Sequence, residues 1–118
     1  MSLDIWLTIK KPACECCGRQ AEEIEVFETN ITHNLIQMAG KAGIYDYVWT
    51  PDVIGIKKAG DLIYPLEKGI SDMKARPGFY KKFDSSNGWG TYDQFLPWLE
   101  EYLQACKNYP EAEIGISR

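Results

Sequence analysis

Residues 3–10 read LDIWLTIK, and the alternation in this stretch decides how the fold is interpreted. The side chains divide into two sets on opposite faces: Ile5, Leu7 and Ile9 against Asp4, Trp6, Thr8 and Lys10. Alternation with a period of two is typical of a strand that buries one face. The sequence therefore predicts a strand here, which Pro12 ends.

Two further stretches alternate in the same way. In residues 22–28, Ile24 and Val26 stand against Glu23, Glu25 and Phe27. Residues 11–21, which carry three cysteines, join this stretch to the first one. A connection of about ten residues favours an antiparallel hairpin with an elaborated loop. Residues 112–117 (AEIGIS) alternate again and are expected to form a third strand.

Helical periodicity occurs in three segments between these strands. Each segment has an apolar stripe: Ile31, Leu35, Met38 and Ala42; then Leu62, Leu66, Ile70 and Met73 within 58–74; then Phe95, Leu99, Tyr102, Leu103 and Cys106. Spacings of three and four residues predict helices with one buried face. We expect Thr29 or Asn30 to cap the first helix and Gly43 to end it. Thr91 and Gln94 match a capping box at the start of the third.

Two prolines constrain these helices, because proline has no N–H to donate to the carbonyl four residues earlier. Pro65 has to lie in the first turn of the second helix or kink it. Pro97 is expected to move the start of the third helix toward Gln94.

Together these patterns predict a single α+β domain over residues 1–118. We expect a small, largely antiparallel three-stranded sheet with about three helices packed on one face. The 118 residues are 45% hydrophobic and 13% aromatic, which is enough for a core without disulfide or metal staples.

The charge and the apolar runs exclude some partners. Thirteen basic and seventeen acidic residues give a net charge of -4, which argues against nonspecific binding to nucleic acid. No segment approaches the ~20 apolar residues of a membrane span, and the start shows no secretory signal pattern. We therefore expect a soluble cytoplasmic protein, and an exposed sheet edge offers it a route to a homodimer.

The segment Cys14-Glu15-Cys16-Cys17-Gly18 is the sharpest local motif. A Cys-x-x-Cys-Gly turn after a strand is typical of half a zinc site. Only His33 and Cys106 could complete the set with Cys14 and Cys17, so the hypothesis is one zinc ion that stabilises the fold. Free thiols in a reducing cell are the favoured alternative, and a thioredoxin-like redox pair is weaker because no helix follows.

The segment Asn30-Ile31-Thr32-His33-Asn34 is the second motif. If a helix begins at Asn30, then Asn30, His33 and Asn34 share its polar face and could bind a small polar ligand or a protein partner. The alternative is a solvated helix face on which the histidine is incidental.

A third feature is the segment Asn87-Gly88-Trp89-Gly90-Thr91-Tyr92. The aromatic connections 43–56 and 76–90 are expected to fold back over the core. Trp89 in such a loop is first of all a hydrophobic anchor. The functional alternative is that Trp89 and Tyr92 wall a pocket whose polar side is formed by His33 and Asn34.

Catalysis is not favoured. His33 with one of the loop cysteines superficially resembles a cysteine-hydrolase pair, but no helix start would lower the pKa of the thiol. The leading hypothesis is a binding or interaction module without enzymatic activity; a zinc-stabilised protein and an enzyme using His33 are the alternatives. On the leading hypothesis, His33→Ala should leave folding intact and abolish binding.

In overall layout the chain resembles a set of small proteins encoded in phage and bacterial genomes. The resemblance is carried by the cysteine turn, by NITHN at 30–34, by NGWGTY at 87–92 and by IGISR at 114–118, and it covers nearly the full length. It implies a self-contained unit with an intracellular role. It implies no activity and no site residues.

Overall fold

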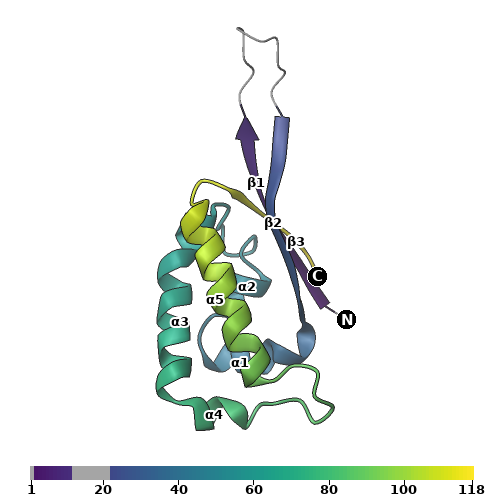
Figure 1. Ribbon diagram of the computed structural model, residues 1–118, viewed down its shortest axis with the longest axis vertical. Coiled ribbons are helices and arrows are strands. Elements are labelled where there is room, and N and C mark those ends of the chain that lie inside the picture. The colour runs from purple at the N-terminus through teal and green to yellow at the C-terminus, as the bar shows by residue number, and fades with distance from the viewer. Residues whose placement is uncertain (1, 12–21) are drawn as a thin grey trace, which may run out of the picture.

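Strand β1 (Ser2–Lys11) lies at the centre of a three-stranded antiparallel sheet with the order β2-β1-β3. The computed structural model describes residues 2–11 and 22–118. Strand β2 (Glu22–Thr32) pairs along the whole of β1, whereas β3 (Glu113–Ser117) pairs only with its residues 4–8. The expected hairpin and third strand are confirmed, and β1 and β2 continue beyond β3 as a two-stranded ribbon (Figure 1).

A β-bulge in β2 changes the faces that its residues occupy. Leu7 pairs with Phe27 but Thr8 pairs with Glu25, so Val26 is the extra residue. Residues directly opposite one another share a face, so Phe27 lies on the same face as Leu7. The simple alternation predicted for residues 22–28, with Phe27 on the polar face, is therefore wrong at this point.

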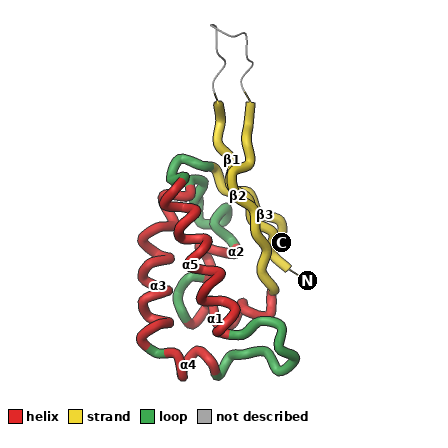
Figure 2. The backbone as a smooth tube through the Cα atoms, in the orientation of Figure 1, coloured by secondary structure: helices red, strands yellow, loops and turns green. Residues whose placement is uncertain are grey.

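The helices all lie on one face of the sheet (Figures 1 and 2). In chain order they are η1 (His33–Leu35), α1 (Ile36–Lys41), α2 (Tyr45–Trp49), η2 (Ala59–Leu62), α3 (Ile63–Ala75), α4 (Pro77–Lys81) and α5 (Tyr92–Asn108). The fold is therefore α+β as expected. Helices α2 and α4 lie within the two aromatic connections, whose Trp49 and Tyr80 are buried against the core.

The first helical segment begins later than its apolar stripe predicts. Strand β2 continues to Thr32, so Asn30 is a strand residue and does not begin a helix. The Thr32 hydroxyl then accepts a hydrogen bond from the Asn34 amide at 3.2 Å and caps η1. Gly43, with a φ of 75°, follows the helix end as expected.

Both prolines lie inside helices. Pro65 is in the first turn of α3, where its missing N–H costs nothing. Pro97 lies within α5, which begins at Tyr92, so the expected shift of the start toward Gln94 is wrong. The Gln94 side chain accepts a hydrogen bond from the Thr91 amide at 3.2 Å, and this cap holds the early start in place.

The core lies between the sheet and helices α3 and α5. Leu3, Ile5 and Leu7 of β1 are at most 1% exposed. Helix α5 is joined to β2 by two contacts: the rings of Phe27 and Tyr102 stack at 6.1 Å, and Trp98 Nε1 donates to Thr29 Oγ1 at 2.8 Å. These two contacts dock α5 on the covered face of β2.

No helix of the described residues lies on the opposite face of the sheet (Figure 1). Trp6 lies there across Gly115 of β3, where any added Cβ would overlap the indole. Five acidic side chains share this face with Trp6, namely Asp4, Glu23, Glu25, Glu28 and Glu113, together with Lys10 and the uncharged Ser2, Thr8, Asn30, Thr32 and Ser117. Desolvation raises the pKa of Glu25, and the neighbouring Glu28 carboxylate raises it further.

The bond between Trp98 and Thr29 provides a test of how α5 docks on β2. Trp98→Phe and Thr29→Val should each lower the free energy of unfolding by about 1 kcal/mol, because a partly buried hydrogen bond is lost. In urea denaturation, the double variant should lose less free energy of unfolding than the sum of the losses in the two single variants. Strict additivity would mean that this bond contributes nothing.

Candidate functional site

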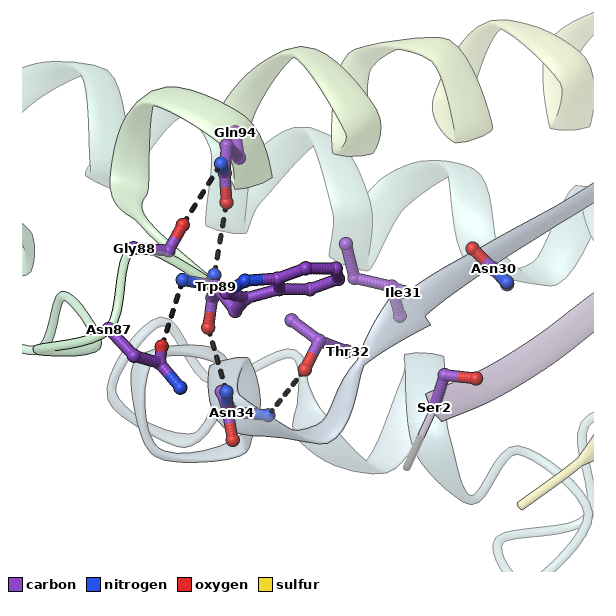
Figure 3. A pocket seen from close by; sticks show the side chains of 10 residues that line it. Ser2, Asn30, Ile31, Thr32, Asn34, Asn87, Gly88, Trp89 and Gln94 are labelled. Atoms are coloured by element: carbon purple, nitrogen blue, oxygen red, sulfur yellow. Dashed lines mark hydrogen bonds between the residues drawn. The ribbon is translucent and has the colours of Figure 1, made fainter.

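An open cleft of about 910 Å³ lies between the end of β2 and the loop that precedes α5 (Figure 3). It is lined by Ser2, Asn30, Ile31, Thr32, Asn34, Asn87, Gly88, Trp89, Gly90 and Gln94. Ser2, Asn30 and Thr32 lie on the uncovered face of the sheet, because Ser2 pairs with Thr32 and Asn30 with Asp4. Ile31 pairs with the buried Leu3 and belongs to the covered face, so the cleft lies at the edge of β2 and reaches both faces of the sheet.

Side-chain amides hold the loop 85–90 in one conformation. Asn87 Oδ1 accepts from the Trp89 amide at 2.9 Å and from the Ser85 hydroxyl at 2.6 Å. Gln94 Oε1 accepts from the Gly90 amide at 3.0 Å, and Gln94 Nε2 donates to the Gly88 carbonyl at 3.2 Å. The backbone is thus fastened on both sides of Trp89, which fixes the direction of its Cα–Cβ bond.

One hydrogen bond ties this loop to the segment after β2. Asn34 Nδ2 donates to the Trp89 carbonyl at 2.8 Å. Gly90 makes the approach close enough: its φ is 106°, and an added Cβ would lie 3.0 Å from Asn34 Cβ and 3.1 Å from Thr32 Cγ2. Glycine is required here both by the backbone angle and by the space.

Trp89 itself is 71% exposed although its backbone is held so firmly. Its indole points toward Ile31 at the end of β2 (Figure 3). A large apolar ring on a fixed backbone loses little entropy when a ligand covers it. The expectation that Trp89 anchors the loop in the core is therefore wrong; hydrogen bonds anchor the loop instead.

The polar groups around this ring are uncharged. Among the lining side chains are three asparagines, one glutamine, one serine and one threonine, and no acidic or basic residue. The side-chain oxygen of Asn34, Oδ1, and the side-chain amide group of Asn30 have no hydrogen-bond partner within the described residues. The cleft therefore offers both donors and acceptors to a ligand without attracting a charge.

The structure brings together three of the five predicted ligand-binding residues, namely Asn30, Asn34 and Trp89. Tyr92 lies elsewhere: it is 6% exposed, and its hydroxyl donates to the Met73 carbonyl at 2.8 Å. Its pKa is raised, mainly by burial. Tyr92 is a core residue and does not wall the cleft.

His33 is also turned away from the cleft and is tied to the core. Its Nδ1 accepts from Nε1 of the buried Trp49 at 2.9 Å, so a neutral His33 carries its proton on Nε2. Trp49 in turn packs against Tyr45 and Phe95, with ring centroids at 5.9 and 6.3 Å. His33 and Asn34 do not share a face, because adjacent residues of a 3-10 helix such as η1 point in directions about 120° apart.

Four polar residues of the cleft were not among the predicted ligand-binding residues: Ser2, Thr32, Asn87 and Gln94. Asn87 could have been found, because an asparagine before Gly-Trp-Gly is a typical side-chain cap of a turn. Ser2 and Thr32 could not, since only the strand register places them beside the loop.

Of the residues in the zinc hypothesis, His33 and Cys106 belong to the described part of the chain. Cys14, Cys16 and Cys17 lie outside the described residues. Cys106 is fully buried in the core, and burial raises the pKa of its thiol to about 12. Within residues 2–11 and 22–118 no three His, Cys, Asp or Glu residues are grouped to hold a metal. A zinc site stays a prediction.

The structure does not bring His33 and Cys106 together. The Trp49 partner of His33 contacts Phe95 near the start of α5. Cys106 lies about 16 Å further along that helix, at 1.5 Å per residue. Two ligands of one zinc ion have to lie within a few ångströms of each other, so this pair does not complete one site.

A second polar cluster, Asp72, Arg76 and Tyr80, has a structural role. Arg76 Nη2 donates to Asp72 Oδ2 at 2.6 Å, and the Tyr80 hydroxyl donates to the same carboxylate. These bonds lower the pKa of Asp72, while burial and the carboxylate raise that of Tyr80 to about 12. Because the cluster spans the junction of α3 and α4, it fixes the sharp turn there.

No helix in the described part of the chain is long and apolar enough to cross a membrane. Comparison with known proteins found no family model, no curated protein and no solved structure that matches the chain. The assignment of a site therefore rests on its geometry, and the resemblance to phage and bacterial proteins stays a prediction.

The bond between His33 and Trp49 predicts a structural role for the histidine, in contrast to the earlier expectation. His33→Ala should lower the free energy of unfolding by about 1–3 kcal/mol, because a buried N–H loses its acceptor. His33→Asn keeps an acceptor near the position of Nδ1, so it should lose less free energy of unfolding than His33→Ala. If the denaturation midpoints of wild type and His33→Ala coincide, this role is wrong.

Burial of Cys106 predicts that its thiol is inert in the folded protein. The raised pKa keeps the thiol protonated at mildly alkaline pH, and the core excludes reagents. Iodoacetamide should leave Cys106 unmodified in the native protein and alkylate it in guanidinium chloride, as measured by peptide mass spectrometry. Equal labelling in both states would contradict the burial.

Proposed function

We propose that the protein is a non-catalytic binding module that holds an uncharged polar ligand in the cleft around Trp89. The observation that carries the proposal is the combination at this residue: the backbone is fixed by hydrogen bonds, yet the indole is 71% exposed. Exposed aromatic rings on rigid backbone are typical of the residues that dominate binding energies.

The energy available from this ring is substantial. If a ligand covers about 100 Å² of the indole, the burial contributes roughly 2.5 kcal/mol, or about 70-fold in affinity. Because the loop is held before the ligand arrives, little of this is lost to ordering. The surrounding asparagines add hydrogen bonds that select the ligand's orientation.

The lining side chains support binding more than catalysis. The cleft has no ionisable side chain among its lining residues, so they include no general acid or base. His33 has its Nδ1 engaged by Trp49 and lies outside the cleft lining. A binding role needs only what the cleft contains, namely an apolar ring and amide and hydroxyl groups.

The proposal can be tested by NMR titration of the ¹⁵N-labelled protein with uncharged probes: neutral sugars, nucleosides and capped short peptides. At least one probe class should shift the Trp89 indole resonance and the Asn34 side-chain amide, saturably and together. Trp89→Ala should abolish these effects while changing the free energy of unfolding by under about 1 kcal/mol, because the ring is mostly exposed.

Tyr64→Ala is the matched control. Tyr64 of α3 is 73% exposed and does not line the cleft, so its removal should leave binding unchanged. The proposal fails if no probe class shifts the cleft resonances, or if the two variants lose binding equally.

A further inference from the structure

We infer that the ligand is a neutral oligosaccharide, which runs from Trp89 across the uncovered face of the sheet to Trp6. This inference rests on the proposed function and adds the ligand class and a second contact. The observation behind it is that the cleft continues into a second hollow on that face.

The second hollow shares a residue with the cleft. It has a volume of about 460 Å³ and is lined by Asp4, Ile5, Trp6, Glu28, Thr29 and Asn30. Asn30, which also lines the cleft, pairs with Asp4, and Trp6 pairs with Glu28. Trp6 and Asn30 are therefore diagonal neighbours on one face, roughly 7 Å apart. A chain-like ligand could contact both hollows without a break.

Trp6 offers a second flat surface. Its indole lies across Gly115, the one position of β3 where the absence of a side chain leaves room for it. The ring is only half-buried, and none of the helices in residues 22–118 covers this side of the sheet (Figure 1). The Trp6 indole leans toward β3, on the side of β1 away from β2, so Asn30 of β2 lies between the two apolar platforms that Trp6 and Trp89 form.

The chemistry of these platforms matches that of a sugar chain. Each sugar ring has an apolar C–H face, which can stack on an indole, and a rim of hydroxyls that donate and accept hydrogen bonds. Asparagine side chains offer a donor group and an acceptor group together, as do the hydroxyls of Ser2 and Thr32. Asp4 and Glu28 can accept from further hydroxyls beside Trp6.

The acidic side chains of the second hollow disfavour anionic ligands. Asp4 and Glu28 line the second hollow, Glu25 lies beside Glu28, and neither hollow is lined by a lysine or an arginine. Phosphates, sulfates and uronic acids would meet like charge there. A nucleic acid or a charged glycan is therefore disfavoured against a neutral one.

Geometry disfavours an extended peptide. A peptide that pairs with the free edge of β2 would run parallel to that strand. Trp6 lies on β1, the strand beyond β2, so its backbone would be roughly 10 Å from such a peptide at the usual strand spacing. A ligand that contacts both tryptophans has to cross the strands, as a chain lying on the sheet face does.

The experiment uses protein labelled with 5-fluorotryptophan and titrated with cellohexaose, chitohexaose, maltohexaose and laminarihexaose, with hexagalacturonate as the charged comparison. At least one neutral hexasaccharide should shift the ¹⁹F resonances of both Trp6 and Trp89, assigned by Trp→Phe variants. The resonances of buried Trp49 should not move. Hexagalacturonate should produce at least tenfold weaker binding.

Asn30→Ala supplies a variant at the shared residue. Asn30 is exposed, so the variant should fold. Its affinity for the neutral hexasaccharide, measured by isothermal titration calorimetry, should be at least tenfold lower than that of the wild type. Ser117→Ala, on the same face but outside both hollows, should bind like the wild type.

Three outcomes would overturn the inference. The first is that none of the four neutral hexasaccharides binds, while a capped peptide or a nucleoside still shifts Trp89; the proposed function then stands with another ligand class. The second is that a hexasaccharide shifts Trp89 alone, which removes the path to Trp6. The third is that no probe of any class reaches the cleft, in which case the proposed function fails as well.

Discussion

The burial of one face of β1 is the constraint on which the rest of the structure depends. Leu3, Ile5 and Leu7 are excluded from water by the helices, and β1 is paired on both sides. Because side chains alternate along a strand, the same burial forces Asp4 and Trp6 onto the opposite face. The hydrophobic core and the surface beside the cleft are therefore two consequences of one alternation.

The bulge at Val26 extends this constraint to β2. Without the extra residue, β2 could not direct Phe27 toward α5 and still keep Ile24 opposite Ile9. With it, Phe27, Thr29 and Ile31 face the helices, and Asn30 is left on the open face. The contact between α5 and β2 thus fixes where the cleft begins.

Two adjacent residues after β2 show how closely structure and site are combined. His33 accepts a hydrogen bond from Trp49 in the core, and Asn34 donates one to the loop that holds Trp89. The turn between them sends the two side chains in different directions. A change at His33 would therefore reach the cleft through the backbone of η1, without any direct contact with the ligand.

The sequence by itself determined the sheet and the helical stripes of α3 and α5, because periodicity and capping are local properties. Only the tertiary structure decided that Asn30 is a strand residue, that His33 and Tyr92 belong to the core, and that Ser2 lies beside the loop. These facts depend on the bulge, on the strand register and on contacts between residues far apart in the chain, such as Asn34 with Trp89. A local pattern contains no information about such pairings, since their energies arise only once the helices pack against the sheet.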